Sequence, residues 1–384
     1  MNSALNGWGR QKTRQEEVCL NQLRIRKAGA VMIRRILLMM LMVGTLTAAA
    51  LFGQDAATTP AARPNDAEKL RTNPKYAQAN KLMQQGKFDE AIEELKKFQQ
   101  ENPPPEDLPH ELGIAYYRKG DYYNAVKSFE QAVKENPKDQ EAIQMTGLSL
   151  YLAGKPGEAI PYLEKVLAWY PEANVDASYI LGVAYIQTKK YPEARASFGK
   201  MFGVSPDSAA AYLFCARMLL RLDFGPIAEE YGKKAIELDP KLPMAHFLLG
   251  ELYLYQSRIP EAIAALEQEM ALNPGYAAVY YKLADGYLRT QKFDEAEKLL
   301  QKSIWLDATS TGPFILMGKV FEKKGETELA VRTLQRAISM EPNNAIPHHL
   351  LGQAYRELGR AEDAERELKL AEQLQMKDTT AVKP

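Results

Sequence analysis

At 384 residues, with 26% charged and 46% hydrophobic side chains, the chain has the composition of a folded protein. Residues 1–53 carry eight Lys and Arg against two Asp and Glu, whereas residues 54–384 carry 41 basic against 47 acidic side chains. The larger part therefore has a net charge of −6, which is the wrong sign for displacing counterions from nucleic acid. We expect no nucleic-acid partner.

The N-terminal part contains a basic segment followed by an apolar one. Met32 opens a short stretch with two arginines, an apolar run of 17 residues extends from Ile36 to Phe52, and small residues stand at its end. This order is typical of a secretory signal peptide. Because the run is at the lower length limit for crossing a membrane, residues 32–53 predict a cleaved signal peptide, with a retained membrane anchor as the alternative.

The segments around this run are polar. We interpret residues 1–31 as an extension upstream of a true start at Met32, or else as the cytoplasmic tail of an anchored protein. Residues 54–71, rich in Ala, Thr and Pro, predict a flexible linker, and residues 377–384 a disordered tail. We therefore expect an exported protein of the periplasm or cell envelope, or alternatively a single-pass protein anchored in the inner membrane.

A 34-residue period dominates the chain from residue 72 to 376. Each unit has a small residue and, twelve residues later, an alanine, and most units end in proline. The small residues are Ala79, Gly113, Gly147, Gly182, Ala216, Gly250, Ala284, Gly318 and Gly352; the alanines are Ala91, Ala125, Ala159, Ala194, Ala228, Ala262, Ala296, Ala330 and Ala364. Large apolar residues at i, i+3 and i+4 on both sides of a Gly-containing break predict two helices per unit.

This pattern resembles the tetratricopeptide repeat (TPR) family, whose signature is a large residue, Leu-Gly, Tyr, then Ala-x₃-Phe and a closing Pro. The resemblance implies an all-α, right-handed α-solenoid (a superhelix) of antiparallel helix pairs, with about eighteen helices and no sheet. Nine repeats are expected, at approximately 72–105, 106–139, 140–174, 175–208, 209–242, 243–276, 277–310, 311–344 and 345–376.

Two positions depart from the repeat pattern in a way that bears on packing. Glu269 and Ser303 replace the alanine that is usual near the end of the second helix, so the pattern predicts the packing of repeats six to eight least well. Cys215 precedes the small residue of its repeat, where other repeats have leucine, and we expect it to be a buried small hydrophobe. Because Cys19 lies before the apolar run, Cys215 is the only thiol of the repeats.

No motif for catalysis, a cofactor or a metal stands out in the sequence. His348 and His349 are adjacent and diverge on a helix, and no His/Glu pair with i, i+4 spacing completes a zinc site. Neither a phosphate-binding Gly-rich loop nor a Gly-x-Ser-x-Gly elbow occurs. We expect the protein not to be an enzyme, and to use neither cofactor nor metal.

The resemblance also implies a binding surface, because the first helix of each TPR unit lines a concave groove that holds protein or peptide segments. Its positions in this chain, which we call the groove positions, contain the candidate partner-binding residues Tyr76, Asn80, His110, Ile114, Tyr117, Gln144, Leu148, Tyr151, Tyr179, Val183, Ile186, Arg217, Phe247, Glu251, Tyr281 and Asp285. Further groove positions are Met83, Leu213, Leu220, Leu254, Leu288, Ile315, Lys319, Glu322, His349, Gln353 and Arg356.

Two features of these positions point to function. Repeats two to four carry mostly apolar and aromatic groove residues, which we predict to be the partner site. A row of mixed charges, Arg217, Glu251, Asp285 and Lys319, follows at one residue per repeat. The alternative is that these side chains are packed between helices, or that the charges neutralise one another.

The expected function is that of an exported scaffold that mediates protein–protein interaction in the assembly of a cell-envelope complex. The alternative is an accessory or regulatory subunit of an envelope enzyme, such as a polysaccharide synthase or a peptidase. Both place the working surface on the first helices of the repeats.

We predict that the mature chain begins near Leu51 or Gln54, because the basic, apolar and small residues of 32–53 have the order of a cleaved signal. N-terminal sequencing of the protein purified from its host measures this. An intact Met1 or Met32 on the mature product would show that the segment is retained.

Overall fold

The computed structural model describes residues 74–169 and 175–381. The predicted extension 1–31, signal peptide 32–53 and linker 54–71 lie outside these residues and stay predictions. Within the described part, no helix combines the length and the apolar character that crossing a membrane requires.

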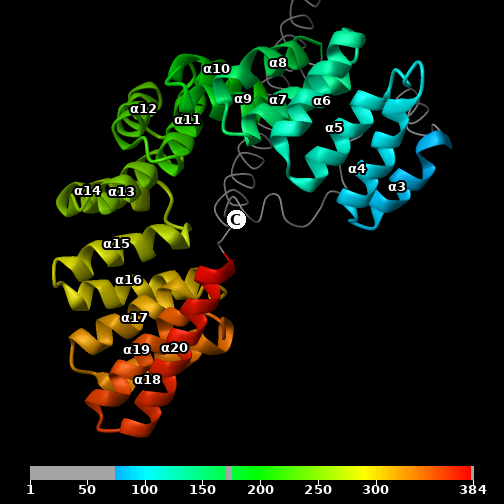
Figure 1. Cartoon of the computed structure of the whole chain (residues 1–384). Coiled ribbons are helices and arrows are strands. Elements are labelled where there is room, and N and C mark those ends of the chain that lie inside the picture. The colour runs from blue at the N-terminus through cyan, green and yellow to red at the C-terminus, as the bar shows by residue number, and fades with distance from the viewer. Residues whose placement is uncertain (1–73, 170–174, 382–384) are drawn as a thin grey trace, which may run out of the picture. The chain divides into compact units, whose positions relative to one another are not determined.

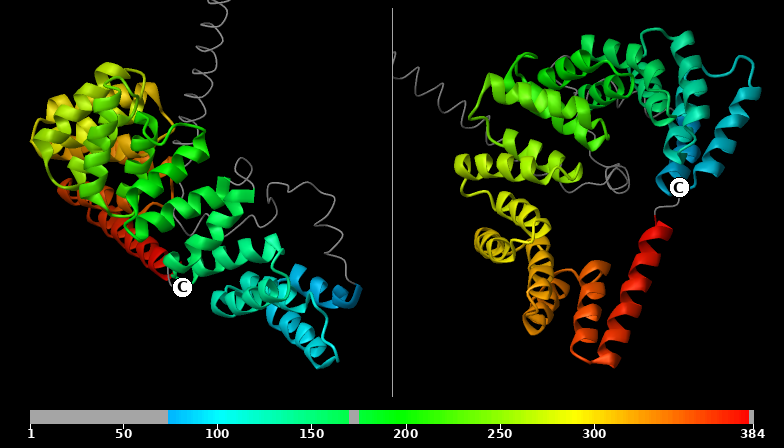
Figure 2. Two further views of the ribbon diagram at one scale, coloured as in Figure 1. Left: turned by 90° about the horizontal axis from the view of Figure 1, so that it is seen from above. Right: turned by 90° about the vertical axis from the view of Figure 1, so that its left-hand side faces the viewer.

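The chain divides into two compact units, Met1–Leu108 and Pro109–Pro384. The described part of the first unit contains one helical hairpin, flanked by the 3₁₀ turns η1 (Pro74–Tyr76) and η2 (Phe98–Gln100). The second unit contains the other eight hairpins, whose order along the chain is visible in Figures 1 and 2. Among the described residues there are eighteen α-helices and no strand, which confirms the predicted all-α solenoid.

Each repeat consists of a first and a second helix. The first helices are α3 (Ala77–Gln84), α5 (Leu108–Lys119), α7 (Gln140–Leu152), α9 (Val175–Gln187), α11 (Ala209–Arg221), α13 (Ala245–Tyr255), α15 (Ala277–Arg289), α17 (Gly312–Lys323) and α19 (Ala345–Glu357). The second helices are α4 (Phe88–Lys97), α6 (Tyr122–Glu135), α8 (Pro156–Trp169), α10 (Tyr191–Phe202), α12 (Gly225–Leu238), α14 (Ile259–Leu272), α16 (Phe293–Leu306), α18 (Thr327–Met340) and α20 (Ala361–Ala381).

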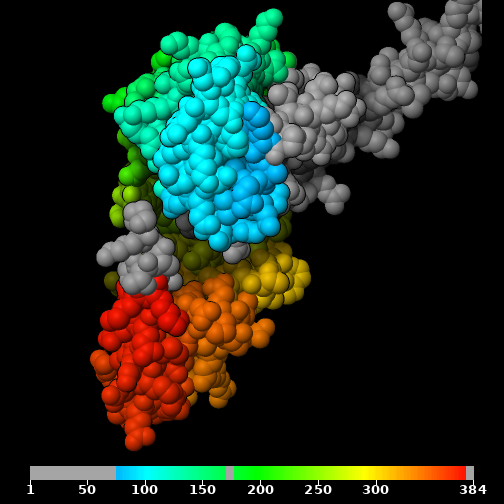
Figure 3. All heavy atoms as spheres, turned by 45° about the vertical axis from the view of Figure 1, so that its right-hand side comes forward, coloured from blue at the N-terminus to red at the C-terminus, as the bar shows by residue number. Residues whose placement is uncertain are grey.

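The last helix is longer than the repeat pattern indicates. The sequence predicts disorder from residue 377, but α20 continues to Ala381, so that prediction is wrong for residues 377–381. Figure 3 shows α20 in red at the surface of the C-terminal end of the array. Its outward-facing residues are polar and mostly exposed, as in the capping repeats of solenoids.

The small residues of the pattern stand where two helices of a hairpin nearly touch. A methyl group on Gly250 of α13 would lie 2.5 Å from Cγ of Leu266 in α14, too close for any real side chain. Ala194, the alanine of repeat four, is completely buried. The recurring small residue and alanine therefore set the close approach of the two helices in each repeat.

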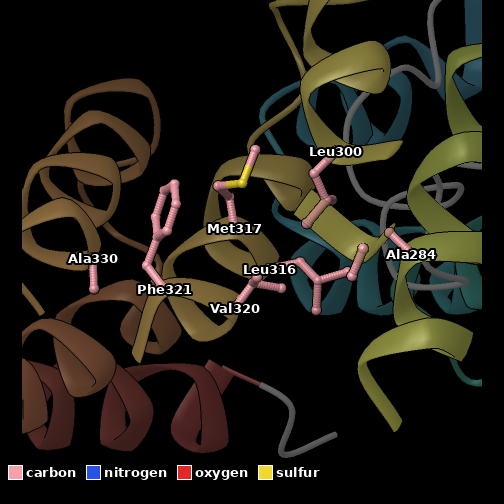
Figure 4. Packing of buried hydrophobic residues seen from close by; sticks show 8 residues of the cluster. Ala284, Leu300, Leu316, Met317, Val320, Phe321 and Ala330 are labelled. Atoms are coloured by element: carbon pink, nitrogen blue, oxygen red, sulfur yellow. The ribbon is translucent and has the colours of Figure 1, made fainter. Parts of the chain in front are cut away.

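The cores of successive repeats join into one another. In Figure 4, Leu316, Met317 and Val320 of α17 lie near Ala284 and Leu300 of the preceding hairpin. Phe321, one residue further along α17, belongs to the same cluster, as does Ala330 of α18. A first helix thus buries side chains against the hairpin before it as well as against its own second helix.

Glu269 explains how repeat six accommodates a residue that breaks the pattern. Its side chain is completely buried in α14, and its carboxylate accepts hydrogen bonds from the backbone N–H groups of Met244 (2.8 Å) and Phe247 (3.3 Å). Asn273 donates to the same carboxylate. Met244, the residue before α13, has a φ of +73° and provides no side-chain cap. The carboxylate of α14 therefore caps the N-terminus of α13 from outside that helix.

Ser303, the second departure, is also buried and satisfied. Its hydroxyl donates to the carbonyl oxygen of Ala277 at 2.9 Å, which links the end of α16 to the start of α15. Ser197 in repeat four, at a different position of the repeat, also joins the two helices of its hairpin, by donating to the carbonyl of Ser178 at 2.9 Å. Buried serines in these repeats thus add hydrogen bonds between the two helices of a hairpin.

We predict that Glu269→Ala destabilises the chain by about 1–3 kcal/mol, because two buried N–H groups at the start of α13 lose their acceptor. Glu269→Gln, which keeps one acceptor oxygen, should cost less. The free energy of unfolding in urea and hydrogen exchange in α13 measure both effects.

The matched control is Gln268→Ala, one residue away on the exposed side of α14. It should change the free energy of unfolding by no more than about 0.5 kcal/mol. Equal stability of Glu269→Ala and Gln268→Ala would show that the carboxylate does not support α13.

Candidate functional site

Three first helices of the C-terminal repeats share one pocket. Groove positions on α15, α17 and α19, which Figure 1 labels in sequence along the array, recur one repeat apart and bring their side chains together. The pocket has a volume of about 650 Å³, is open to solvent, and is lined by Leu288, Arg289, Gln291, Phe293, Lys319, Glu322, Lys323, Leu350 and Gln353. Four of these, Leu288, Lys319, Glu322 and Gln353, are groove positions in the sequence. We call this the C-terminal pocket.

The charge of the C-terminal pocket is predominantly positive. Its lining contains three cations, Arg289, Lys319 and Lys323, and one anion, Glu322. Arg289 pairs with Asp285 at 2.8 Å, and Lys323 pairs with Glu322 at 3.4 Å. Lys319 is half-buried and forms no ion pair with any residue that the structure describes. One ammonium group in the pocket is thus left without a counter-charge.

An apolar wall completes the pocket. Leu288 and Phe293 are half-buried, and Leu350 is almost fully buried. Leu288 and Phe293 also pack against the core that surrounds α17, which fixes their position. The pocket therefore offers fixed apolar surface beside positively charged groups.

The row of charges that precedes the pocket is largely neutralised. Glu251 of α13 pairs with Arg217 at 3.4 Å and with Lys282 at 3.2 Å. Asp285 is held by Arg289, whose guanidinium also donates to the carbonyl of Leu254 at 3.2 Å. Within the row, Arg217 and Glu251 thus neutralise each other, whereas Asp285 is neutralised by Arg289 from outside the row and Lys319 has no described counter-charge.

Four candidate binding residues are core residues instead, and their expected exposure is wrong. Tyr76, Val183, Ile186 and Phe247 are at most 3% exposed. In the first unit, the Tyr76 ring packs edge-on against Phe98, and its hydroxyl donates to Asp107 at 2.7 Å.

The reason is clearest in α9, where every residue from 181 to 186 is buried. This helix is apolar around its whole circumference, so Val183 and Ile186 pack against neighbours on several sides. In α13, the Phe247 ring lies edge-on to Tyr276, with centroids 5.2 Å apart. Among the other groove positions, Met83, Leu213 and Leu254 are buried as well.

The remaining groove residues of repeats two to four are half-buried and keep part of their surface in solvent; they are His110, Ile114, Tyr117, Gln144, Leu148, Tyr151 and Tyr179. Tyr117 packs edge-on against Tyr122, and Tyr179 lies against Phe198. Burial raises the pKa of the Tyr151 hydroxyl, and the nearby Tyr179 raises it further. Asn80, Tyr281, Glu251 and Asp285 in other repeats are similarly half-buried. Partner binding by all these residues stays a prediction.

The sequence pattern predicts only some of the residues that line the C-terminal pocket. Arg289, Gln291, Phe293, Lys323 and Leu350 are not groove positions, and Lys282 was not expected to neutralise Glu251. The available signal was spacing: Arg289 follows Asp285 by four residues, which places the two on one helix face. Phe293 at the start of a second helix gives no such signal.

No metal centre is found in the described residues, where no three His, Cys, Asp or Glu side chains gather closely enough to hold an ion. Cys215 is completely buried, as the repeat position predicts, and burial raises the pKa of its thiol to about 12. Burial therefore favours the neutral thiol over the reactive thiolate.

His110 is a groove residue whose ring lies close to two carboxylates. Its Nδ1 lies 2.8 Å from Oδ2 of Asp139, and its Nε2 lies 3.9 Å from Glu141. Burial lowers the pKa of His110, but the hydrogen bond and charge of Asp139, helped by Glu141, outweigh burial and raise the pKa above 6.5. Burial raises the pKa of Asp139, yet His110 and the backbone N–H of Ala142 lower it below 3.8.

The pair therefore stabilises the fold most between about pH 4 and 6.5. The contribution of His110 is fully present below its unfolded pKa of 6.5 and is lost as pH rises through the raised folded pKa. The contribution of Asp139 is present above 3.8 and is lost as pH falls through the lowered folded pKa.

We predict that Asp139→Asn lowers the pKa of His110 and reduces the loss of unfolding free energy between pH 6 and 8. Asparagine keeps the N-cap of α7, where Asp139 accepts from the N–H of Ala142, so the helix start is retained. NMR titration of His110 and denaturation at several pH values measure the two effects. Identical pH profiles of the two proteins would contradict the coupling.

Comparison with known proteins places this geometry in a family. A model described as "Tetratricopeptide repeat" matches residues 82–146 and 253–304, a model described as "TPR repeat" matches 318–359, and one described as "Anaphase-promoting complex, cyclosome, subunit 3" matches 115–201. These matches fall on hairpins in both halves of the array.

Solved structures with similar folds include MamA (22% identity, 43% of this chain and 96% of that one, TM-score 0.40). YrrB, a TPR protein with an unusual peptide-binding site, is 20% identical over 48% of this chain and 93% of that one, with a TM-score of 0.40. PilF of Pseudomonas aeruginosa is 21% identical over 56% and 99%, with a TM-score of 0.44. Likeness at this level says nothing about a particular partner. With its 34-residue hairpins and the matches of both repeat models, the chain belongs to the tetratricopeptide repeat family, whose members are generally non-catalytic scaffolds for protein–protein interaction.

Proposed function

We propose that this TPR protein is an exported scaffold that holds an extended segment of a partner protein against its first helices, in the assembly of a cell-envelope complex. The observation that carries the proposal is the C-terminal pocket, because side chains from three successive first helices line it together. A surface that is built from one contribution per repeat suits a ligand that runs along the repeats.

The chemistry of the first helices supports a protein ligand. Half-buried tyrosines in repeats two to four combine apolar rings with hydroxyl groups that accept and donate hydrogen bonds. The C-terminal pocket adds an apolar wall and free positive charge. Partner segments with mixed apolar and polar side chains match both surfaces, whereas the acidic balance of residues 54–384 opposes nucleic acid.

Export rests on the sequence of residues 32–53, where two arginines precede the apolar run. An envelope location follows from either fate of this segment, since cleavage releases the repeats beyond the membrane and retention anchors them there. Fractionation of the host cell into cytoplasmic and envelope fractions tests this part. Recovery of the chain in the cytoplasm, with the segment intact, would overturn it.

We predict that Tyr151→Ala combined with Tyr179→Ala weakens partner capture from envelope extracts by roughly tenfold or more, because aromatic anchors carry a large share of binding energy. Capture with the full chain, quantified by titrating the extract, is the measurement. Helical circular dichroism should be unchanged, since both side chains are only half-buried.

The control is Tyr123→Ala combined with Tyr255→Ala, two exposed tyrosines that are not groove positions. It should leave capture unchanged. A folded Tyr151/Tyr179 variant that retains every partner would remove repeats two to four from the binding surface. Capture of an enzyme whose rate depends on the chain would favour the accessory-subunit alternative.

A further inference from the structure

We infer that the C-terminal pocket selects an acidic partner segment, which places a carboxylate beside Lys319 and an apolar side chain against Leu288, Phe293 and Leu350. This inference rests on the proposed function and specifies the chemistry of the partner. It follows from which charged residues of the first helices are paired and which are not.

Lys319, the last member of the row of charges, has no acidic partner among the described residues. In repeats five to seven each groove carboxylate has a cation: Glu251 has Arg217 and Lys282, and Asp285 has Arg289. In repeat eight, Glu322 pairs with Lys323 on its own helix. Lys319 is left half-buried, in a pocket that it shares with two further cations and without a carboxylate of its own.

A partner carboxylate at this place would supply the missing charge. A half-buried ammonium near other cations interacts more favourably with an anion than one in bulk water does, because fewer water molecules screen it. The hydrogen-bond donors of Gln291 and Gln353 line the same pocket and suit a carboxylate or a peptide carbonyl. The pocket thus matches a short acidic stretch in charge and in hydrogen bonding.

The apolar wall and the acidic surroundings favour a protein segment over a long polyanion. Leu288, Phe293 and Leu350 form an apolar surface that a sugar phosphate or sulfate backbone would not cover. Glu322 lies in the same lining, and residues 54–384 have six more acidic than basic side chains. A polymer with a charge on every unit would be repelled outside the pocket, whereas a short segment avoids this.

The test is a selection of random twelve-residue peptides, displayed on phage, on the purified full chain. We expect enriched peptides to combine Asp or Glu with Leu, Ile, Phe or Met. The strongest peptide is then labelled with fluorescein, and its dissociation constant is measured by anisotropy. Versions with the acidic residues changed to Lys, or the apolar residue changed to Ser, should bind at least roughly tenfold more weakly.

The variants locate the binding. Lys319→Glu should weaken the labelled peptide by roughly tenfold or more, and Lys319→Gln by less, because glutamine removes the attraction without adding repulsion. Lys298→Glu on α16 makes the same change in net charge at an exposed residue outside the pocket lining, and should alter the dissociation constant less than about twofold. Circular dichroism controls for folding.

Three outcomes would overturn the inference: no enriched acidic peptide, enrichment of basic peptides, or equal binding by wild type and a folded Lys319→Glu variant. Heparin is then used to displace the labelled peptide. Displacement at a heparin concentration below the dissociation constant of the peptide would assign the pocket to sulfated polysaccharide instead. If Lys319→Glu still captures the envelope partner with unchanged affinity, this inference fails and the proposed scaffold function stands. If wild type captures nothing, the proposed function fails.

Discussion

A helical hairpin of this length cannot bury its apolar face alone, and from α7 to α19 each first helix packs on the second helix of the preceding hairpin. At several of these helix–helix interfaces the same hydrogen bond recurs. The hydroxyl of a first-helix tyrosine donates to a carboxylate of the preceding second helix, from Tyr253 to Glu229 at 3.1 Å and from Tyr287 to Glu267 at 2.7 Å. Tyr185 donates to Glu164 in the same way.

The same junctions carry a cation over the tyrosine ring. The guanidinium of Arg258 lies 4.2 Å from the ring centre of Tyr253 and also pairs with Glu229 at 2.9 Å. In repeat eight the tyrosine is replaced by Phe321, and Lys324 instead bridges to Glu297 and Asp294 of the preceding helix. A polar contact between a first helix, or the turn after it, and the preceding second helix therefore persists in repeat eight although its chemistry changes.

The sequence predicts the packing within each hairpin correctly, because contacts within a repeat are set by the spacing of residues along the chain. Gly250, Ala194 and Cys215 occupy the places that the 34-residue register assigns to them. The exposure of the groove residues depends instead on packing between neighbouring repeats, which the repeat period does not encode. In the apolar helix α9 Val183 and Ile186 are buried, whereas Arg217 at the position of α11 equivalent to Val183 stays half-exposed. Pairing partners such as Lys282 were missed for the same reason, since they reach across from the next repeat.

The departures from the repeat pattern show how one fold accommodates different chemistry. Glu269 brings a carboxylate into the core, which is costly unless the charge finds donors, and the uncapped start of α13 supplies two of them. The irregular residue and the irregular helix start therefore compensate each other. At Lys319 the opposite holds: a charge on a half-buried helix face has no compensating group in the described chain. A site left open in an otherwise neutralised row is where a ligand gains most from bringing the opposite charge.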